Sequence, residues 1–98
     1  MSRAVVFRRE ARLEFDEALI FYEEARQGLG LDFQQAVGES LSEAATHPTL
    51  FRKVRGPIRR IVLKRFPYTL NFVAEKDRIV VLAVFHARRD PRHLTTRR

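Results

Sequence analysis

The sequence predicts an α+β domain in which an N-terminal helical hairpin packs on a small, antiparallel-rich sheet. Two observations support this class. Apolar residues recur at helical spacing between residues 10 and 47, and short β-branched and aromatic runs lie before that region and after it. The expected element order is βααβββ. Because 98 residues can form one core and little more, we expect a single domain over residues 1–91.

The first elements are a strand at residues 4–8 and an amphipathic helix that begins near Glu10. The apolar residues of this helix lie three or four positions apart, on one stripe that Leu19 widens: Ala11, Phe15, Ala18, Tyr22 and Ala25. Gly28 and Gly30 are expected to end the helix after about four turns, since glycine adopts the left-handed conformation favoured at helix C-termini.

A second helix is expected to begin at Leu31 and Asp32, antiparallel to the first because the connection is short. Its apolar stripe consists of Phe33, Val37, Leu41 and Ala44. Pro48 should end it, because a proline forces the preceding residue toward an extended conformation.

Three strands are expected after a polar loop that contains Pro48, Gly56 and Pro57. They occupy residues 58–63, 68–74 and 78–86, with a tight turn at residues 75–77 between the last two. The final strand is apolar at successive positions from Ile79 to Phe85. Apolar residues on both of its faces indicate a strand that is central in the sheet rather than at its edge.

Composition excludes several classes of protein. Without cysteine the chain has neither a disulfide framework nor a thiolate zinc site, and its three histidines are too dispersed in sequence to indicate a metal. The glycines do not form a phosphate-binding loop, so no metal or cofactor is expected. The N-terminus lacks a signal-peptide pattern, and no apolar run approaches the roughly 18–20 residues that span a bilayer. These features indicate a cytoplasmic protein without a membrane partner.

Charge is divided unevenly along the chain. Residues 1–49 hold 5 Arg against 9 Asp and Glu, whereas residues 50–98 hold 14 Arg and Lys against 3 Asp and Glu, which gives net charges of −4 and +11. A basic surface attracts acidic proteins and nucleic acids, although it also occurs for solubility alone. The segment 92–98 is expected to be a basic, mobile tail.

One catalytic possibility follows from the residues themselves, namely RNA cleavage without a metal. The groups for it would be Arg60, Lys64, Tyr68, His86 and Arg88, gathered around one concave face of the sheet. The alternative is that Tyr68 is a core or rim aromatic and the arginines keep the sheet edges soluble.

Motifs over nearly the whole chain resemble the ParE branch of the ParE/RelE toxin superfamily. They are Asp16-Glu17-Ala18, Phe21-Tyr22-Glu23-Glu24, Gly28-Leu29-Gly30 with Phe33, Pro48, Arg59-Arg60, Phe66-Pro67-Tyr68 and the closing residues 86–91, His-Ala-Arg-Arg-Asp-Pro. The resemblance implies the βααβββ fold and a growth-inhibiting toxin of a type II toxin–antitoxin system, of the kind associated with plasmid stabilisation. It also implies a ParD-like antitoxin whose C-terminal segment folds on the toxin.

The superfamily contains two activities, and three residues bear on the choice. RelE-like members are ribosome-dependent mRNA endonucleases, and Arg88 matches a basic residue of their site. Thr69 and Leu94, however, stand where the nucleases have an arginine and a tyrosine. The departure favours the ParE-like activity, which is inhibition of DNA gyrase by binding, without catalytic residues. A nuclease and a non-toxic basic interaction module, with or without direct nucleic-acid contact, remain as alternatives.

Site residues follow from the resemblance and the basic C-terminal cluster. The surface for the target is expected at His86, Arg88, Arg89 and Arg92, supported by Arg59, Arg60 and Lys64. The antitoxin is expected to contact Phe15, Leu19 and Tyr22. For these three residues the pattern favours the alternative that they form the core between the helices and the sheet.

Overall fold

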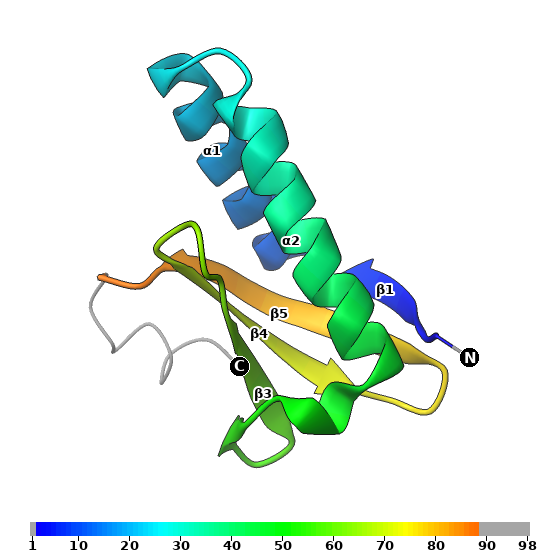
Figure 1. Cartoon of the computed structure of the whole chain (residues 1–98). Helices are drawn as coiled ribbons and strands as arrows, with labels where there is room; N and C mark the ends of the chain where they lie inside the picture. The colour runs from blue at the N-terminus through cyan, green and yellow to red at the C-terminus, as the bar shows by residue number, and fades with distance from the viewer. Residues whose placement is uncertain (1, 89–98) are drawn as a thin grey trace.

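The computed structural model describes residues 2–88 and has two layers, a helical hairpin and a five-stranded sheet (Figure 1). Its elements are β1 (Ala4–Phe7), α1 (Arg9–Ala25), α2 (Leu29–Thr46), the 3-10 turn η1 (Pro48–Leu50), β2 (Lys53–Arg55), β3 (Ile58–Val62), β4 (Tyr68–Ala74) and β5 (Arg78–His86). Within these described residues, no helix combines the length and apolarity needed to cross a membrane. The predicted α+β class and the order of the predicted elements are confirmed, with β2 as an addition.

Strand β2 corrects the expectation of a loop between α2 and the first C-terminal strand. It has three residues and pairs with the start of β3 through Lys53 opposite Arg59 and Arg55 opposite Ile58. Gly56 makes the intervening turn possible because its φ is +52°, in the left-handed region that glycine adopts without strain. With one valine between two basic residues, β2 has too little apolar periodicity to be found in the sequence.

The sheet order is β1-β5-β4-β3-β2, so β5 is central as predicted. Strand β1 runs parallel to β5, and the other neighbours are antiparallel. Between β4 and β5 the register changes, because Asn71 faces Ala83 while Phe72 faces Val81. Leu82 is the extra residue of this bulge, which lets both Val81 and Val84 join the core.

The core lies between the hairpin and the covered face of the sheet, and an aromatic cluster occupies its centre. Phe33 is fully buried, and its ring centroid lies 5.3 Å from those of Tyr22, Phe66 and Tyr68 and 5.7 Å from that of Phe15. Tilted and edge-on ring pairs of this kind add stability beyond the area they bury. The cluster therefore fixes the hairpin over the first residue of β4, Tyr68, which lies opposite His86 at the end of β5.

The hairpin connection differs from the expectation at one glycine. Gly28 has a φ of 90° and makes the turn, but Gly30 lies inside α2, which begins at Leu29. The Glu23 carboxylate accepts hydrogen bonds from the backbone N–H groups of Gly28 and Gly30, each at 3.0 Å. A Cβ on Gly30 would lie 2.9 Å from Glu23 Oε1 and 3.0 Å from the carbonyl oxygen of Leu19. Close approach of the two helices, rather than helix termination, accounts for Gly30.

We expect Gly30→Ala to destabilise the protein by about 1–3 kcal/mol, because the added methyl group would collide with α1 and disturb the Glu23 hydrogen bonds. Gly38 provides the matched control in the same helix, since a Cβ there would meet nothing within 4 Å. Gly38→Ala should stabilise the fold by up to about 1 kcal/mol. Urea unfolding of both variants tests this, and equal shifts in the two variants would contradict it.

Candidate functional site

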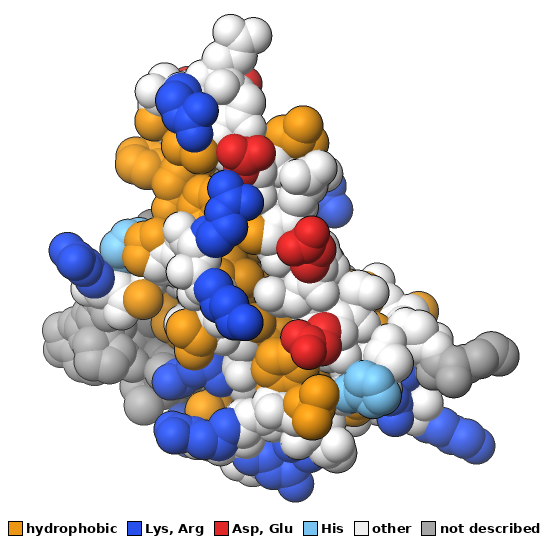
Figure 2. All heavy atoms as spheres, viewed as in Figure 1, with side chains coloured by type: hydrophobic (Ala, Val, Ile, Leu, Met, Phe, Trp, Pro, Cys, Tyr) orange, Lys and Arg blue, Asp and Glu red, His pale blue; other side chains and the backbone are white. Residues whose placement is uncertain are grey.

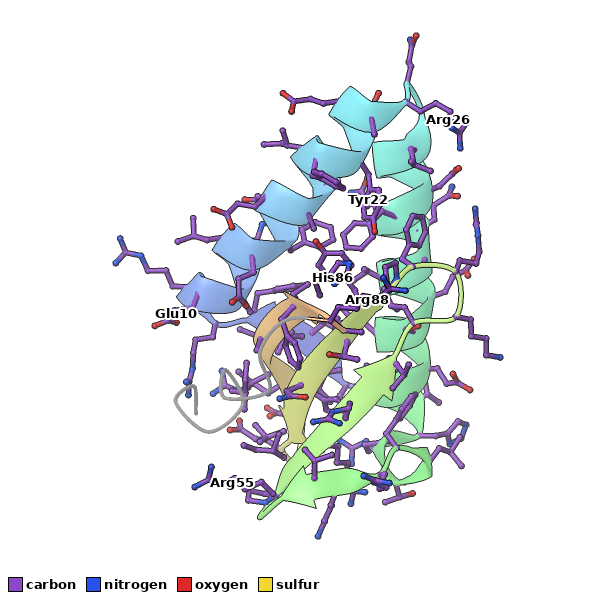
Figure 3. The ribbon with its side chains drawn as sticks, turned by 90° about the vertical axis from the view of Figure 1, so that its left-hand side faces the viewer. Glu10, Tyr22, Arg26, Arg55, His86 and Arg88 are labelled. Atoms are coloured by element: carbon purple, nitrogen blue, oxygen red, sulfur yellow. The ribbon has the colours of Figure 1, made fainter. Side chains whose placement is uncertain are left out.

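A groove of about 410 Å³ lies where the end of β5 meets α1. Residues of α1 form one wall, and residues of β4, β5 and the turn after β5 form the other. Its lining consists of Glu14, Glu17, Ala18, Phe21, Tyr68, Val84, His86 and Arg88. Figure 3 shows His86 and Arg88 close together at this end of the sheet, beneath the helical hairpin.

Several contacts fix His86 in place. It is the last residue of β5, faces Tyr68 across the strand pair, and packs edge-on against the Tyr68 ring at a centroid distance of 5.3 Å. Its Nδ1 accepts a hydrogen bond of 3.1 Å from the backbone N–H of Arg88, so the neutral ring has its proton on Nε2. The N–H of Ala87 donates to the carbonyl of Pro67 at 2.7 Å. The turn that holds Arg88 is therefore tied to the rest of the sheet.

Glu14 connects the two walls of the groove. The pairing of β1 with β5 ends at Phe7 opposite Val81, which leaves the edge of β5 beyond Val81 without a strand neighbour among residues 2–88. Glu14 Oε1 accepts a hydrogen bond of 2.9 Å from the backbone N–H of Val84. A carboxylate thus replaces a strand partner and holds α1 against β5, because an unpaired backbone donor at this site is costly. Sequence reasoning did not identify this residue.

The groove combines opposite charges around an apolar floor. Glu14 and Glu17 lie on the helix wall, and His86 and Arg88 lie on the other. Phe21, which is 62% exposed, stands at the rim. An exposed aromatic residue beside an arginine is typical of a protein-binding surface, since aromatic and arginine side chains dominate binding energies at interfaces.

The three supporting basic residues lie elsewhere. Arg59 and Arg60 are consecutive in β3 and therefore point to opposite faces of the sheet. Arg59 pairs with Phe72, four residues along β4 from Tyr68, or about 13 Å at the usual strand rise. Its Nη1 donates to the carbonyl of Phe51 at 2.8 Å, and the half-buried Arg60 has a buried Nε without a hydrogen-bond partner among the described residues.

Lys64 is separate again, because it lines a second groove of about 310 Å³ between β3 and α2. Of the predicted target-binding residues within 2–88, the structure therefore brings together His86 and Arg88 and places Arg59, Arg60 and Lys64 at other positions. Arg89 and Arg92 lie outside the described residues, as does the predicted tail at 92–98. Of the five residues proposed for RNA cleavage, Tyr68, His86 and Arg88 line the first groove. Arg60 and Lys64 do not line it.

The predicted antitoxin contacts are mostly enclosed. Phe15 is 7% exposed and packs between Phe7 and Phe33, while Leu19 and Tyr22 are partly buried against the same cluster. The periodic stripe that identified α1 is the stripe that packs on the sheet, so it marks the core, as the alternative interpretation proposed. The large apolar residues that are exposed on α1 lie off this stripe: Leu13, Ile20 and Phe21.

Burial, and secondarily the neighbouring Tyr68, raises the pKa of the Tyr22 hydroxyl above its ordinary value of 10.0. The folded state then holds this proton more tightly than the unfolded state does. Stability should be intact below pH 10.0 and fall as the pH rises from there through the raised pKa. Thermal melting across this range should show a smaller alkaline loss for Tyr22→Phe. An identical pH profile for the variant would contradict the prediction.

Comparison with solved structures identifies the class of fold. The chain superimposes on a structure entitled "Chromosomal ParDE TA system from P. aeruginosa" with a TM-score of 0.72 at 16% sequence identity, over 87% of this chain and 96% of that one. At this identity the likeness shows the fold alone, a two-layer α+β domain. A search of curated proteins found no match.

The family follows from the sequence comparison. Residues 5–91 match the model of the ParE toxin of the type II toxin–antitoxin system parDE. The chain therefore belongs to the ParE toxin family, as the motifs indicated, and it is a toxin of a type II toxin–antitoxin system with an antitoxin as partner.

Proposed function

We propose that the chain arrests growth in the cytoplasm by binding DNA gyrase, and that a ParD-like antitoxin holds it inactive. The groove between α1 and the end of β5 is the observation on which the proposal rests. It presents the exposed Phe21 beside Arg88 and His86, an anchor and two basic groups suited to binding a protein. Membership of the ParE toxin family supports the same function.

The position of Thr69 also supports binding rather than catalysis. Thr69 is 7% exposed in the middle of the sheet, opposite Val62 and Phe85, and its hydroxyl is buried. The superfamily's nucleases have an arginine at this position, whose positive charge can stabilise the negative charge on a phosphate. A buried threonine has no positive charge to provide. Leu94, the other departure, lies outside the described residues.

An mRNA endonuclease remains the second candidate because the same groove gathers groups that can move protons. Glu14, Glu17, Tyr68 and His86 line it together with Arg88, and carboxylates and imidazoles are the usual general acids and bases. In that case the substrate phosphate would lie beside Arg88.

Two candidate surfaces for the antitoxin have different exposure. The core residues Phe15, Leu19 and Tyr22 offer little area, whereas Leu13, Ile20 and Phe21 form an exposed apolar stripe at spacings of seven and eight along α1. Positions seven residues apart lie on one helix face. We therefore propose that the antitoxin covers this outer stripe, helped by attraction between its acidic groups and a toxin of net charge +7.

Induced expression in bacteria tests the proposal. DNA breaks with intact mRNA, together with trapped cleavage complexes when the purified chain is added to purified gyrase, are expected. Cleaved mRNA with intact DNA would assign the chain to the nuclease activity instead. Growth without either lesion would indicate a non-toxic interaction module. Co-expression of a ParD-like antitoxin should restore growth.

A further inference from the structure

We propose that the second groove, between α2 and β3, is the surface through which two copies of this chain associate as a symmetric dimer. The inference goes beyond the proposed function, because it concerns the chain by itself and requires neither gyrase nor an antitoxin. It names the occupant of the groove, which is the same groove of a second copy, turned so that each acidic wall faces a basic wall.

The two walls of this groove carry opposite charges. Glu39 and Glu43 lie four positions apart on α2 and form the acidic wall. Lys64 and Arg65 follow β3 and form the basic wall. Figure 2 shows this face, with a row of acidic side chains over α2, a row of basic ones beside it and orange side chains between them. The charge therefore changes sign across the groove, from negative at the helix to positive at the sheet.

These charges are not neutralised across the groove within one chain. Among residues 2–88, no ion pair involves Glu39, Glu43 or Lys64, and all three residues are exposed. Arg65 contacts Asp32 of α2 at 3.8 Å. A partner can therefore pair with both glutamates and with Lys64 without breaking an ion pair that already exists.

Apolar side chains supply the area that a protein contact needs. Phe51, Ile61 and Leu63 lie between the charged walls. Leu50, at 68%, and Val62, at 66%, are the most exposed large apolar residues of the part of the chain that the structure describes. Val62 lines the groove and Leu50 directly precedes Phe51. Exposed apolar area with a charged rim is typical of a surface that binds a protein.

A second copy satisfies both walls at once, whereas a partner of a single charge does not. An acidic peptide or a nucleic acid would be repelled by the wall on α2, and a basic peptide would be repelled by the wall at Lys64. A two-fold axis parallel to the groove sets the acidic wall of each copy against the basic wall of the other. Because such an interface is isologous, each favourable pair forms twice.

The net charge of +7 on each chain opposes association only at long range. Repulsion between charges more than about 8 Å apart is largely screened at physiological ionic strength, so the groups in contact decide the outcome. The two grooves of one chain share no lining residue among those described. The dimer would therefore carry two grooves of the kind that contains Arg88.

Charge reversal on either wall tests the inference. Glu43→Lys and Lys64→Glu each bring like charges together twice in a symmetric dimer, so each should raise the dimer dissociation constant at least about tenfold. An equal mixture of the two variants should associate like the wild type, because the two reversed walls then face each other and the two unchanged walls do the same. Glu24→Lys makes the change of Glu43→Lys on α1 and should dimerise like the wild type.

The measurement is sedimentation equilibrium of the purified full chains, after thermal melting has shown that each is folded. A wild-type chain that stays monomeric at millimolar concentration would overturn the inference, and so would wild-type dimers that neither reversal weakens. Failure of the mixture to regain affinity would also overturn it, because damage to the fold is not repaired by mixing. None of these results bears on the proposed function, since growth arrest and gyrase trapping are measured separately.

Nuclear magnetic resonance of the wild-type chain gives a second readout that requires no variant. The methyl resonances of Leu50 and Val62 should shift as the protein concentration rises, whereas those of Leu13, which is exposed on α1, should not. Spectra that do not depend on concentration would overturn the inference. If the Val62 resonances then shift only on addition of an antitoxin, the groove belongs to that partner and not to a second copy.

Discussion

Phe33→Ala is expected to lower the free energy of unfolding by about 3–5 kcal/mol. Phe33 is fully buried on α2 and contacts rings from α1, from β4 and from the segment before β4. Removing it leaves a cavity that Phe66 and Tyr68 cannot fill without leaving their own positions, since the sheet holds Tyr68 opposite His86. A domain of this size has about 5–15 kcal/mol in total, so the variant should be close to unfolding at 37 °C.

The control for this prediction is Phe21→Ala, which removes the same side chain from the exposed face of α1. Its free energy of unfolding should change by less than about 0.5 kcal/mol. Urea titration followed by far-ultraviolet circular dichroism measures both variants. Comparable losses of stability in the two would show that Phe33 is not the centre of the core.

Local patterns made most of the fold predictable. The 3.6-residue spacing in α1 and α2 and the apolar runs in β4 and β5 identify these elements without any knowledge of their neighbours. The start of α2 and the strand β2 depend on tertiary contacts instead. Gly30 resembles a helix terminator until the approach of Glu23 is known, and Lys53–Arg55 is a strand because β3 lies beside it.

The candidate site was less predictable for a related reason. Basic density in the sequence pointed to His86 and Arg88, which do share a groove, but it also included Arg59 and Arg60, whose alternation in β3 sends them to opposite faces. Apolar periodicity could not separate the buried stripe of α1 from a binding surface. Phe21 is exposed and lies off that stripe. An aromatic residue outside the helical stripe is therefore the sequence signal by which Phe21 could have been identified.

Arg88→Glu is expected to abolish growth arrest and to raise the concentration needed to trap purified gyrase at least about 100-fold, because reversing a charge at a binding surface costs several kcal/mol. Arg88 is exposed, and its described contact within the chain is through the backbone N–H to His86, so the substitution leaves that hydrogen bond in place. The fold should be unaffected. Because Arg89 follows directly in the sequence, the double reversal Arg88→Glu with Arg89→Glu should be at least as severe.

Lys76→Glu makes the same change of charge in the turn before β5, at the opposite end of the strand from His86. Its toxicity should match that of the wild type, which separates a local effect at the groove from the general loss of positive charge. Thermal melting of each variant must show a folded chain for the comparison to be valid. If folded Arg88→Glu is as toxic as Lys76→Glu, Arg88 does not contact the target. If both lose toxicity equally, net charge rather than the groove determines binding.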